Sequence, residues 1–90
     1  MATITESQLQ VKLIRRYEAD GWYVVKIIQT NRNGWPDLML LRDGVCRFVE
    51  VKRPGGKPRP LQVYRMKEII SKGFDCRVVD GFSPDRELQV

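Results

Sequence analysis

Apolar residues recur along this chain with two periods, and each period predicts a different kind of element. A helix is expected over residues 5–20, with Thr3 or Thr5 as its cap, because apolar side chains recur there at about 100° per residue and form one stripe. The stripe consists of Leu9, Leu13, Ile14 and Tyr17. A second helix is expected over residues 61–72, after Pro60 and before Gly73.

Strands are expected where β-branched and aromatic residues cluster between these helices and after them. The expected strands span residues 22–28, 36–41, 45–53 and 76–80. The order is then α-β-β-β-α-β, which predicts an α/β fold with a mixed sheet and helices packed on it. Residues 80–90 contain glycine, proline and several charges, so we expect a loosely held tail or a subunit contact.

The two middle strands place two carboxylates opposite each other. Asp43-Gly44 predicts a type I′ hairpin turn, and counting outward from it pairs Asp37 with Glu50. Opposed side chains in such a ladder have Cβ atoms about 4.5–5.5 Å apart, so like charges repel there. A divalent cation between the carboxylates turns this repulsion into a binding site, which the carbonyl of Val51 would complete. Lys52 shares a face with Glu50, and this set suits metal-assisted attack on a phosphodiester.

Simpler interpretations of these residues stay open. Asp37 follows a proline and fits a turn, although an apolar run begins directly after it. Glu50 interrupts the apolar run of residues 48–51, where an unpaired carboxylate costs several kcal/mol, and a salt bridge to Lys52 would offset this cost.

Two further polar residues fall on helix faces that point towards this site. Glu6 lies within about 20° of the apolar stripe of the first helix, so it is either a site residue or a favourable charge at a helix start. Gln62 shares the stripe of Met66, Ile69 and Ile70 in the second helix. It is a candidate to bind a phosphate, a water molecule or Lys52, or it is ordinary helix sequence.

Composition narrows the class of protein. The chain has 90 residues, which predicts one domain over residues 1–90, and its net charge of +5 favours an anionic partner such as nucleic acid. There is no histidine, which excludes catalysis by a histidine base and Ser-His-Asp or Cys-His chemistry. No apolar run reaches about 18 residues, so no membrane span is expected. Cys46 and Cys76 lie in apolar runs and are expected to be buried thiols in a reducing cell interior.

Basic residues cluster after Glu50, and only Glu68 is acidic between residues 52 and 72. This segment predicts a surface that follows phosphates, the alternative being a solvated helix face. The candidate DNA-binding residues are Arg53, Lys57, Arg59, Arg65 and Lys67. Trp35, close to Asp37, is expected to wedge against a base, to pack in a dimer contact or simply to fill the core.

Four sequence blocks carry a resemblance to a known family. They are residues 34–38 (GWPDL), 49–52 (VEVK), 56–62 (GKPRPLQ) and 73–79 (GFDCRVV). In this order, and after a helical Glu6, they resemble the virus-type replication-repair nuclease family, VRR-NUC, of the PD-(D/E)XK nuclease superfamily. The resemblance implies the restriction-endonuclease-like core, Asp37 and Glu50 as ligands of Mg²⁺ or Mn²⁺, Lys52 as a catalytic residue, Glu6 in the site and Gln62 in support.

The function expected from these observations is a Mg²⁺-dependent endonuclease acting on DNA. Small stand-alone relatives resemble phage or bacterial proteins that act as homodimers on branched DNA such as four-way (Holliday) junctions, while larger relatives serve DNA repair. The expected setting is therefore the cytoplasm of a bacterial or phage-infected cell. The alternatives are a non-catalytic nucleic-acid-binding module, a nuclease of flaps or plain duplex, and a base-specific restriction-type nuclease.

Overall fold

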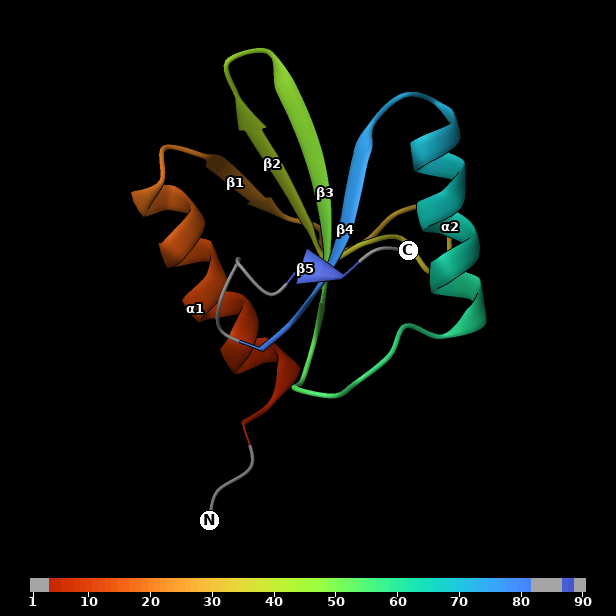
Figure 1. Cartoon of the computed structure of the whole chain (residues 1–90), viewed down its shortest axis with the longest axis horizontal. Helices are drawn as coiled ribbons and strands as arrows, with labels where there is room; N and C mark the ends of the chain where they lie inside the picture. Colours follow the sequence, from red (N-terminus) through yellow and green to blue (C-terminus); the bar gives the residue numbers. More distant parts are fainter. Residues whose placement is uncertain (1–3, 82–86, 89–90) are drawn as a thin grey trace.

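The computed structural model describes residues 4–81 and 87–88, which form one mixed sheet between two helices (Figure 1). The elements in chain order are α1 (Glu6–Ala19), β1 (Tyr23–Lys26), β2 (Leu38–Arg42), β3 (Val45–Lys52), α2 (Pro60–Ser71), β4 (Asp75–Asp80) and β5 (Glu87–Leu88). The sheet order is β1-β2-β3-β4-β5, with β3 and β4 parallel and the other pairs antiparallel. The expected mixed α/β fold is confirmed.

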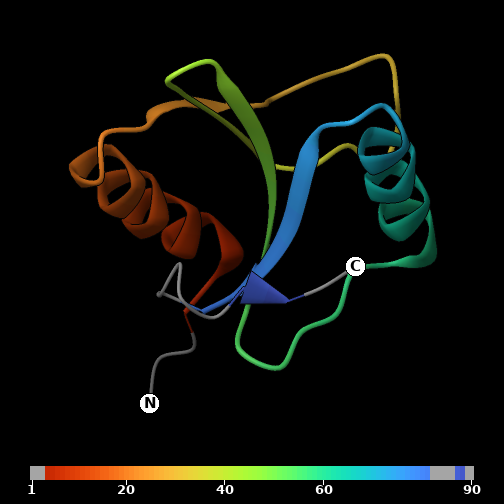
Figure 2. The same ribbon diagram turned by 45° about the horizontal axis from the view of Figure 1, so that its top comes forward.

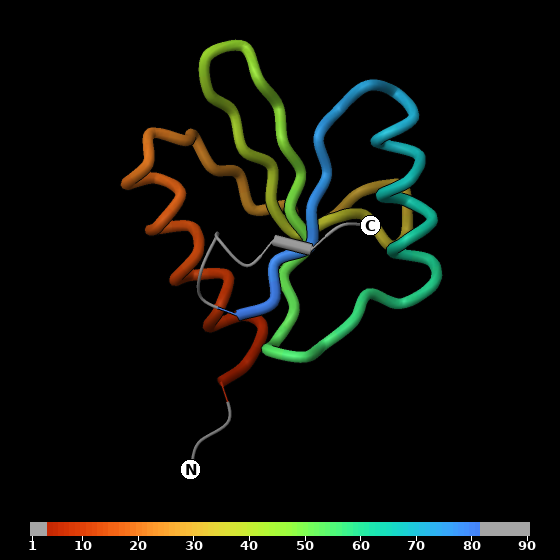
Figure 3. Tube along the Cα trace, in the orientation of Figure 1, coloured from red at the N-terminus to blue at the C-terminus, as the bar shows by residue number. Residues whose placement is uncertain are grey.

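The two helices cover opposite faces of the sheet (Figure 2). α1 begins with a capping box, in which Thr5 accepts a hydrogen bond from the amide of Gln8 and the Gln8 side chain returns one to Thr5. Leu9, Leu13 and Tyr17 of α1 are buried in a first core against β2 and β3, as their stripe predicts. This capped, packed helix places its first residue beside the end of β3, where Figure 3 shows the two segments meeting.

α2 packs over a second, smaller core on the other face. Met66 and Ile69 are buried there against Cys76 and Val78 of β4. Ile70 was expected on the same stripe, but its side chain is 45% exposed. The expectation was wrong because α2 contacts the sheet through a narrow row of residues spaced by three, which are Val63, Met66 and Ile69. Ile70 lies outside this row.

The predicted hairpin register is confirmed. Asp43 and Gly44 both have positive φ, at 50° and 78°, as a type I′ turn requires. Behind the turn Arg42 pairs with Val45 and Met39 pairs with Phe48. The same register places Asp37, the residue before β2, opposite Glu50.

Two expectations need correction. Residues 80–90 were expected to form a loosely held tail or a subunit contact, but Glu87 and Leu88 pair with Val79 and Val78 of β4, while residues 82–86 and 89–90 lie outside the described part of the chain. A two-residue strand has no periodic pattern, so only its pairing defines it. Cys46 was expected to be buried and is only half-buried, because β1 to β3 extend beyond the part of the sheet that α2 covers, whereas Cys76 is buried as expected.

Candidate active site

Polar side chains from four segments meet at one end of the sheet. Glu6 is the first residue of α1, Asp37 directly precedes β2, Glu50 and Lys52 lie on β3, and Gln62 lies in the first turn of α2. The structure thus brings together all five side chains that the sequence predicted for the catalytic site.

Backbone hydrogen bonds fix the carboxylate of Asp37. Its Oδ2 accepts a hydrogen bond of 2.8 Å from the amide of Val51, and its carbonyl accepts one of 2.8 Å from the amide of Ile27. Because the N–H and C=O of one strand residue point to the same side of the strand, the carbonyl of Val51 also faces Asp37. A carboxylate and a backbone oxygen therefore face one point from neighbouring strands.

Glu50 is buried with one oxygen satisfied and one not. Its side chain is 2% exposed, and its Oε1 accepts a hydrogen bond of 2.9 Å from Nε2 of Gln62 and lies 3.4 Å from Nζ of Lys52. Its Oε2 has no hydrogen-bond partner in the described part of the chain. A buried carboxylate oxygen without a donor is costly, and a cation bound beside it would offset that cost.

Both carboxylates resist ionisation without a cation. Burial raises the pKa of Asp37, against the lowering effects of the Val51 amide and Lys52. Burial, together with the charge of Asp37, raises the pKa of Glu50 to about 8. A divalent cation between the two carboxylates would oppose both shifts, because its charge favours their ionised forms.

Lys52 is a buried cation between two acids. Its side chain is 7% exposed, and its Nζ lies 3.4 Å from Oε1 of Glu50 and 3.9 Å from Oε1 of Glu6. The side chain of Glu6 is 43% exposed, so this acid lies at the rim of the site rather than within it. The ammonium group is therefore held in place beside Glu50, with its remaining donors available to a ligand.

Gln62 links the site to the start of α2. Its Nε2 donates to Glu50, and its Oε1 accepts a hydrogen bond of 2.8 Å from the amide of Arg59. The partner that the structure gives Gln62 is Glu50, which was not among the partners expected from the sequence. Gln62 therefore orients a carboxylate, and the loop before α2 becomes part of the same hydrogen-bonded unit.

The donor set fits a hard cation. No group of three or more Asp, Glu, Cys or His side chains surrounds one point in the described ranges, so the oxygens that could hold a metal ion here are those of two carboxylates and the Val51 carbonyl. Mg²⁺ is commonly bound through one or two carboxylates, with water and substrate phosphate in the other positions. The unpartnered Oε2 of Glu50 and the repelling pair of carboxylates both agree with such a cation.

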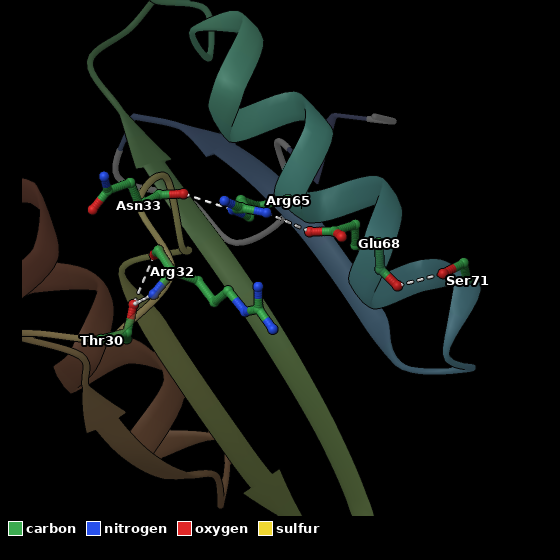
Figure 4. Close-up of polar contacts among 6 residues, drawn as sticks. All are labelled: Thr30, Arg32, Asn33, Arg65, Glu68 and Ser71. Carbon is green, nitrogen blue, oxygen red and sulfur yellow. Dashed lines mark hydrogen bonds and ion pairs between the residues drawn. The ribbon is translucent and has the colours of Figure 1, made fainter.

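The predicted DNA-binding residues fall into two groups. Arg53, Lys57 and Arg59 are exposed on the loop between β3 and α2, and Lys67 is exposed on α2. Arg65 is half-buried instead, and it donates 2.7 Å and 2.8 Å hydrogen bonds to the carbonyl of Asn33 and the carboxylate of Glu68 (Figure 4). Arg65 therefore ties α2 to the loop before Asp37.

Sequence reasoning missed Asp80, which is 5% exposed and pairs in register with Lys52 across β3 and β4. Its Oδ2 accepts a hydrogen bond of 3.3 Å from the amide of Gly55, while the amide of Gly81 donates to the carbonyl of Lys52. Asp80 thus anchors the start of the basic loop beside the site. Asp80 lies on β4, which pairs with β3 in parallel through a long crossover connection. No local sequence pattern fixes the register of such a pair.

Comparisons with known proteins agree with this geometry. The VRR-NUC domain family matches residues 4–83. The protein named "Putative nuclease p44" of Acyrthosiphon pisum secondary endosymbiont phage 1 is 32% identical over 82 residues, which are 90% of this chain and 88% of the phage protein. None of the helices in the described residues is long and apolar enough to cross a membrane.

Two solved structures share the fold. One, a VRR_NUC domain, superposes with a TM-score of 0.77 at 37% identity and covers 90% of this chain and 88% of its own. The other, a VRR_NUC domain protein, has a TM-score of 0.76 at 17% identity, with coverage of 96% and 84%. At that identity the second structure supports the fold alone.

Proposed function

The chain belongs to the VRR-NUC nuclease family, and we propose that it is a divalent-metal-dependent endonuclease that cuts branched DNA as a homodimer. One observation carries the proposal: Glu50 is buried opposite Asp37 and has one carboxylate oxygen with no partner among the described residues. A sequence selected only for stability would avoid such a pair, whereas a metal site requires it.

Each residue of the site has a distinct role in this proposal. Asp37, Glu50 and the Val51 carbonyl would hold Mg²⁺, or Mn²⁺ in its place, and the bound ion would neutralise the scissile phosphate and lower the pKa of a bound water. Lys52 positions the attacking water or stabilises charge that develops on the phosphate. Glu6 and Glu50 hold the Lys52 ammonium, and Gln62 keeps Glu50 in the orientation that the site needs.

The exposed basic loop supports DNA as the substrate. Arg53, Lys57 and Arg59 follow Lys52 directly in the chain and are exposed, so they can reach phosphates on either side of the cut. Lys67 extends this surface along α2. The expected setting is the cytoplasm of a bacterial or phage-infected cell, where the chain meets intracellular DNA.

An exposed apolar surface supports the homodimer. Tyr23 and Leu41 pair across β1 and β2, and these two residues are 70% and 37% exposed. Apolar groups grouped in this way are typical of subunit contacts. A two-fold dimer presents two metal sites related by symmetry, which suits a junction with two equivalent strands to cut.

A cleavage assay tests the proposal directly. Four-way junction, flap and plain duplex DNA are incubated with the protein, with and without Mg²⁺ or Mn²⁺, and Glu50→Gln serves as the control for contaminating nuclease. We expect metal-dependent cleavage of the junction above the other substrates, and a dimer by light scattering at assay concentration. Binding without cleavage under all conditions would instead support a non-catalytic nucleic-acid-binding module.

A further inference from the structure

A hollow in the surface lies beside the candidate active site and takes no part in the proposed metal chemistry. It has a volume of about 310 Å³, near the lower end of ligand pockets, which range from about 300 to 1,000 Å³. The loop between β1 and β2 forms one wall, and the sheet forms the floor. The lining residues include Ile27, Thr30, Arg32, Trp35, Met39 and Phe48.

The floor of this hollow continues the strand face that carries the carboxylates. Met39 and Phe48 are a cross-strand pair, and Asp37 and Glu50 form the next pair on that same face. Two residues along a strand span about 6.6 Å, so the hollow lies one side-chain repeat from the metal-binding carboxylates. One nucleotide of an extended DNA strand covers a comparable distance.

The lining is aromatic and apolar, with a cation at its rim. Trp35 and Phe48 meet edge to face, with ring centroids 5.5 Å apart, and Met39 adds a polarisable sulfur. Arg32 projects from the loop, as Figure 4 shows, and the loop is held by hydrogen bonds between Thr30 and the Arg32 backbone. The Arg32 guanidinium makes no hydrogen bond or ion pair within residues 4–81 or 87–88.

We propose that this hollow receives one unstacked nucleobase of the DNA substrate while the adjacent phosphate lies at the Asp37–Glu50 site. Aromatic side chains and planar arginine groups bind unpaired bases by stacking, without sequence preference. The planar Arg32 guanidinium at the rim would stack on this base, with its charge towards the flanking phosphate. The inference rests on the proposed function and deepens it, because an unstacked base occurs at a junction or a flap but not in plain duplex.

The charge at the rim favours a nucleotide over a second copy of the chain. No carboxylate lines the hollow, and the chain carries a net charge of +5, so another copy would bring like charge to Arg32. The apolar surface of Tyr23 and Leu41 lies on the same strand face, one side-chain repeat from Met39 towards the hairpin turn, so the oligomeric state of the variants is part of the test.

An abasic scan tests the base site independently of cleavage. A flap substrate is made with the base removed at successive positions counted from the branch point, and binding is measured with the Glu50→Gln protein without metal. We expect one position at which loss of the base weakens binding by about 5-fold to 150-fold, the range that base–aromatic stacking supplies. Equal binding at every position overturns the proposal.

Variants then assign the effect to the hollow. In Arg32→Ala and, separately, Met39→Gln, the intact flap should bind less tightly, and the penalty for the missing base should fall to about 2-fold or less. Arg15→Ala removes a charge from the exposed side of α1 and should keep the full penalty. Circular dichroism confirms that each variant is folded, and an unchanged penalty in both hollow variants overturns the assignment.

Two outcomes separate this inference from others. Absence of cleavage on every substrate, with the position-specific penalty intact, would remove the proposed nuclease function and keep the base site. A shift from dimer to monomer in Arg32→Ala or Met39→Gln would show that a second copy fills the hollow, and would overturn the base site while cleavage chemistry remained testable.

Discussion

The two ends of the β3–β4 pair carry charged clusters of opposite design. At one end Asp75 receives hydrogen bonds of 2.8 Å from Arg47 and 3.0 Å from Arg77, so two cations surround one acid. At the other end, Glu50, Asp37 and Glu6 gather around the ammonium of Lys52. The same pair of strands thus holds an excess of positive charge at one end and of negative charge at the other.

The pKa values of the two clusters move in opposite directions. Burial raises the pKa of Asp75, but hydrogen bonds from Arg77 and Arg47 outweigh it and leave the pKa below its usual value. Burial and the charge of Asp37 raise the pKa of Glu50 to about 8, and Lys52 does not compensate. In the first cluster the one acid is paired with two arginines, which stabilises the fold, whereas in the second the acids outnumber the single ammonium, so the cluster is suited to binding a further cation.

Removal of either metal-binding carboxylate should have the largest effect on activity. Asp37→Asn and Glu50→Gln each delete a ligand, and we expect single-turnover cleavage to fall by at least about 100-fold, since loss of a group that merely supports a metal ligand already costs about 10–100-fold. Asp75→Asn, in the arginine-paired cluster at the other end of the strands, is the matched control and should cleave DNA at nearly the wild-type rate. Full activity in either site variant with Mg²⁺ present would refute the assignment.

Lys52→Ala should separate chemistry from metal binding. The role proposed for the ammonium is at the reacting phosphate or water, so we expect turnover to fall by about 10²–10³-fold, as for loss of one donor to a transition state. Calorimetry should still detect Mg²⁺ binding, because Asp37 and Glu50 remain. Loss of Mg²⁺ affinity with turnover retained would make Lys52 a structural residue.

Local patterns predicted the pairing of the two carboxylates correctly. The Asp43-Gly44 turn and the two-residue period of a strand are both set within about 15 residues, and together they fix the pairing of Asp37 with Glu50. Helix geometry likewise predicted the side of α1 on which Glu6 lies, because Glu6 and the buried apolar stripe belong to the same helix.

Features that depend on distant segments could not be predicted in the same way. The position of Asp80 beside Lys52 depends on the register of a parallel pair formed across the whole of α2. The bond from Arg65 to the Asn33 carbonyl joins residues 32 apart, so the sequence suggested only a basic side chain on a helix. The partner of Gln62 likewise depended on how the start of α2 meets β3.

Thermal stability without metal should respond in opposite ways at the two clusters. Glu50→Gln removes a repelling charge and keeps an acceptor for Gln62, so we expect a higher Tm at pH 8, by roughly 4–8 °C for each kcal/mol gained. Asp75→Asn removes an acid paired with two arginines and should lower the Tm. Differential scanning fluorimetry in EDTA measures both changes, and shifts of the same sign would contradict the comparison.

The pH dependence follows from the same pKa shifts. The pKa of Glu50 is about 8 in the folded protein and near 4.5 in the unfolded chain, so the folded state binds the proton more tightly. Its stabilising contribution is complete below pH 4.5 and is lost as the pH rises through 8. We therefore expect the Tm of the metal-free protein to fall between pH 5 and pH 8.5, less steeply in Glu50→Gln. Asp75 has a lowered pKa, so its contribution is lost only in acid, as the pH falls through that pKa.

The smallest expected effects concern the basic residues, and the effect expected for Arg65 differs from the effects expected for Lys57 and Arg59. Lys57→Ala and Arg59→Ala should each weaken binding to all DNA sequences and reduce the log–log salt slope by about 0.9, because each removes one phosphate contact. Both side chains are exposed, so the Tm should stay close to that of the wild type. Fluorescence anisotropy from 50 to 200 mM salt measures the slopes.

Arg65→Ala removes a group that already has two protein partners, and its side chain is only 17% exposed. We expect a lower Tm, since the Asn33 carbonyl and Glu68 lose their donor, together with an unchanged salt slope. A slope reduced by about 0.9 at unchanged Tm would instead return Arg65 to the phosphate-binding surface. The salt slope counts phosphate contacts and the Tm reports internal bonds, so the two measurements together assign each arginine to the DNA or to the fold.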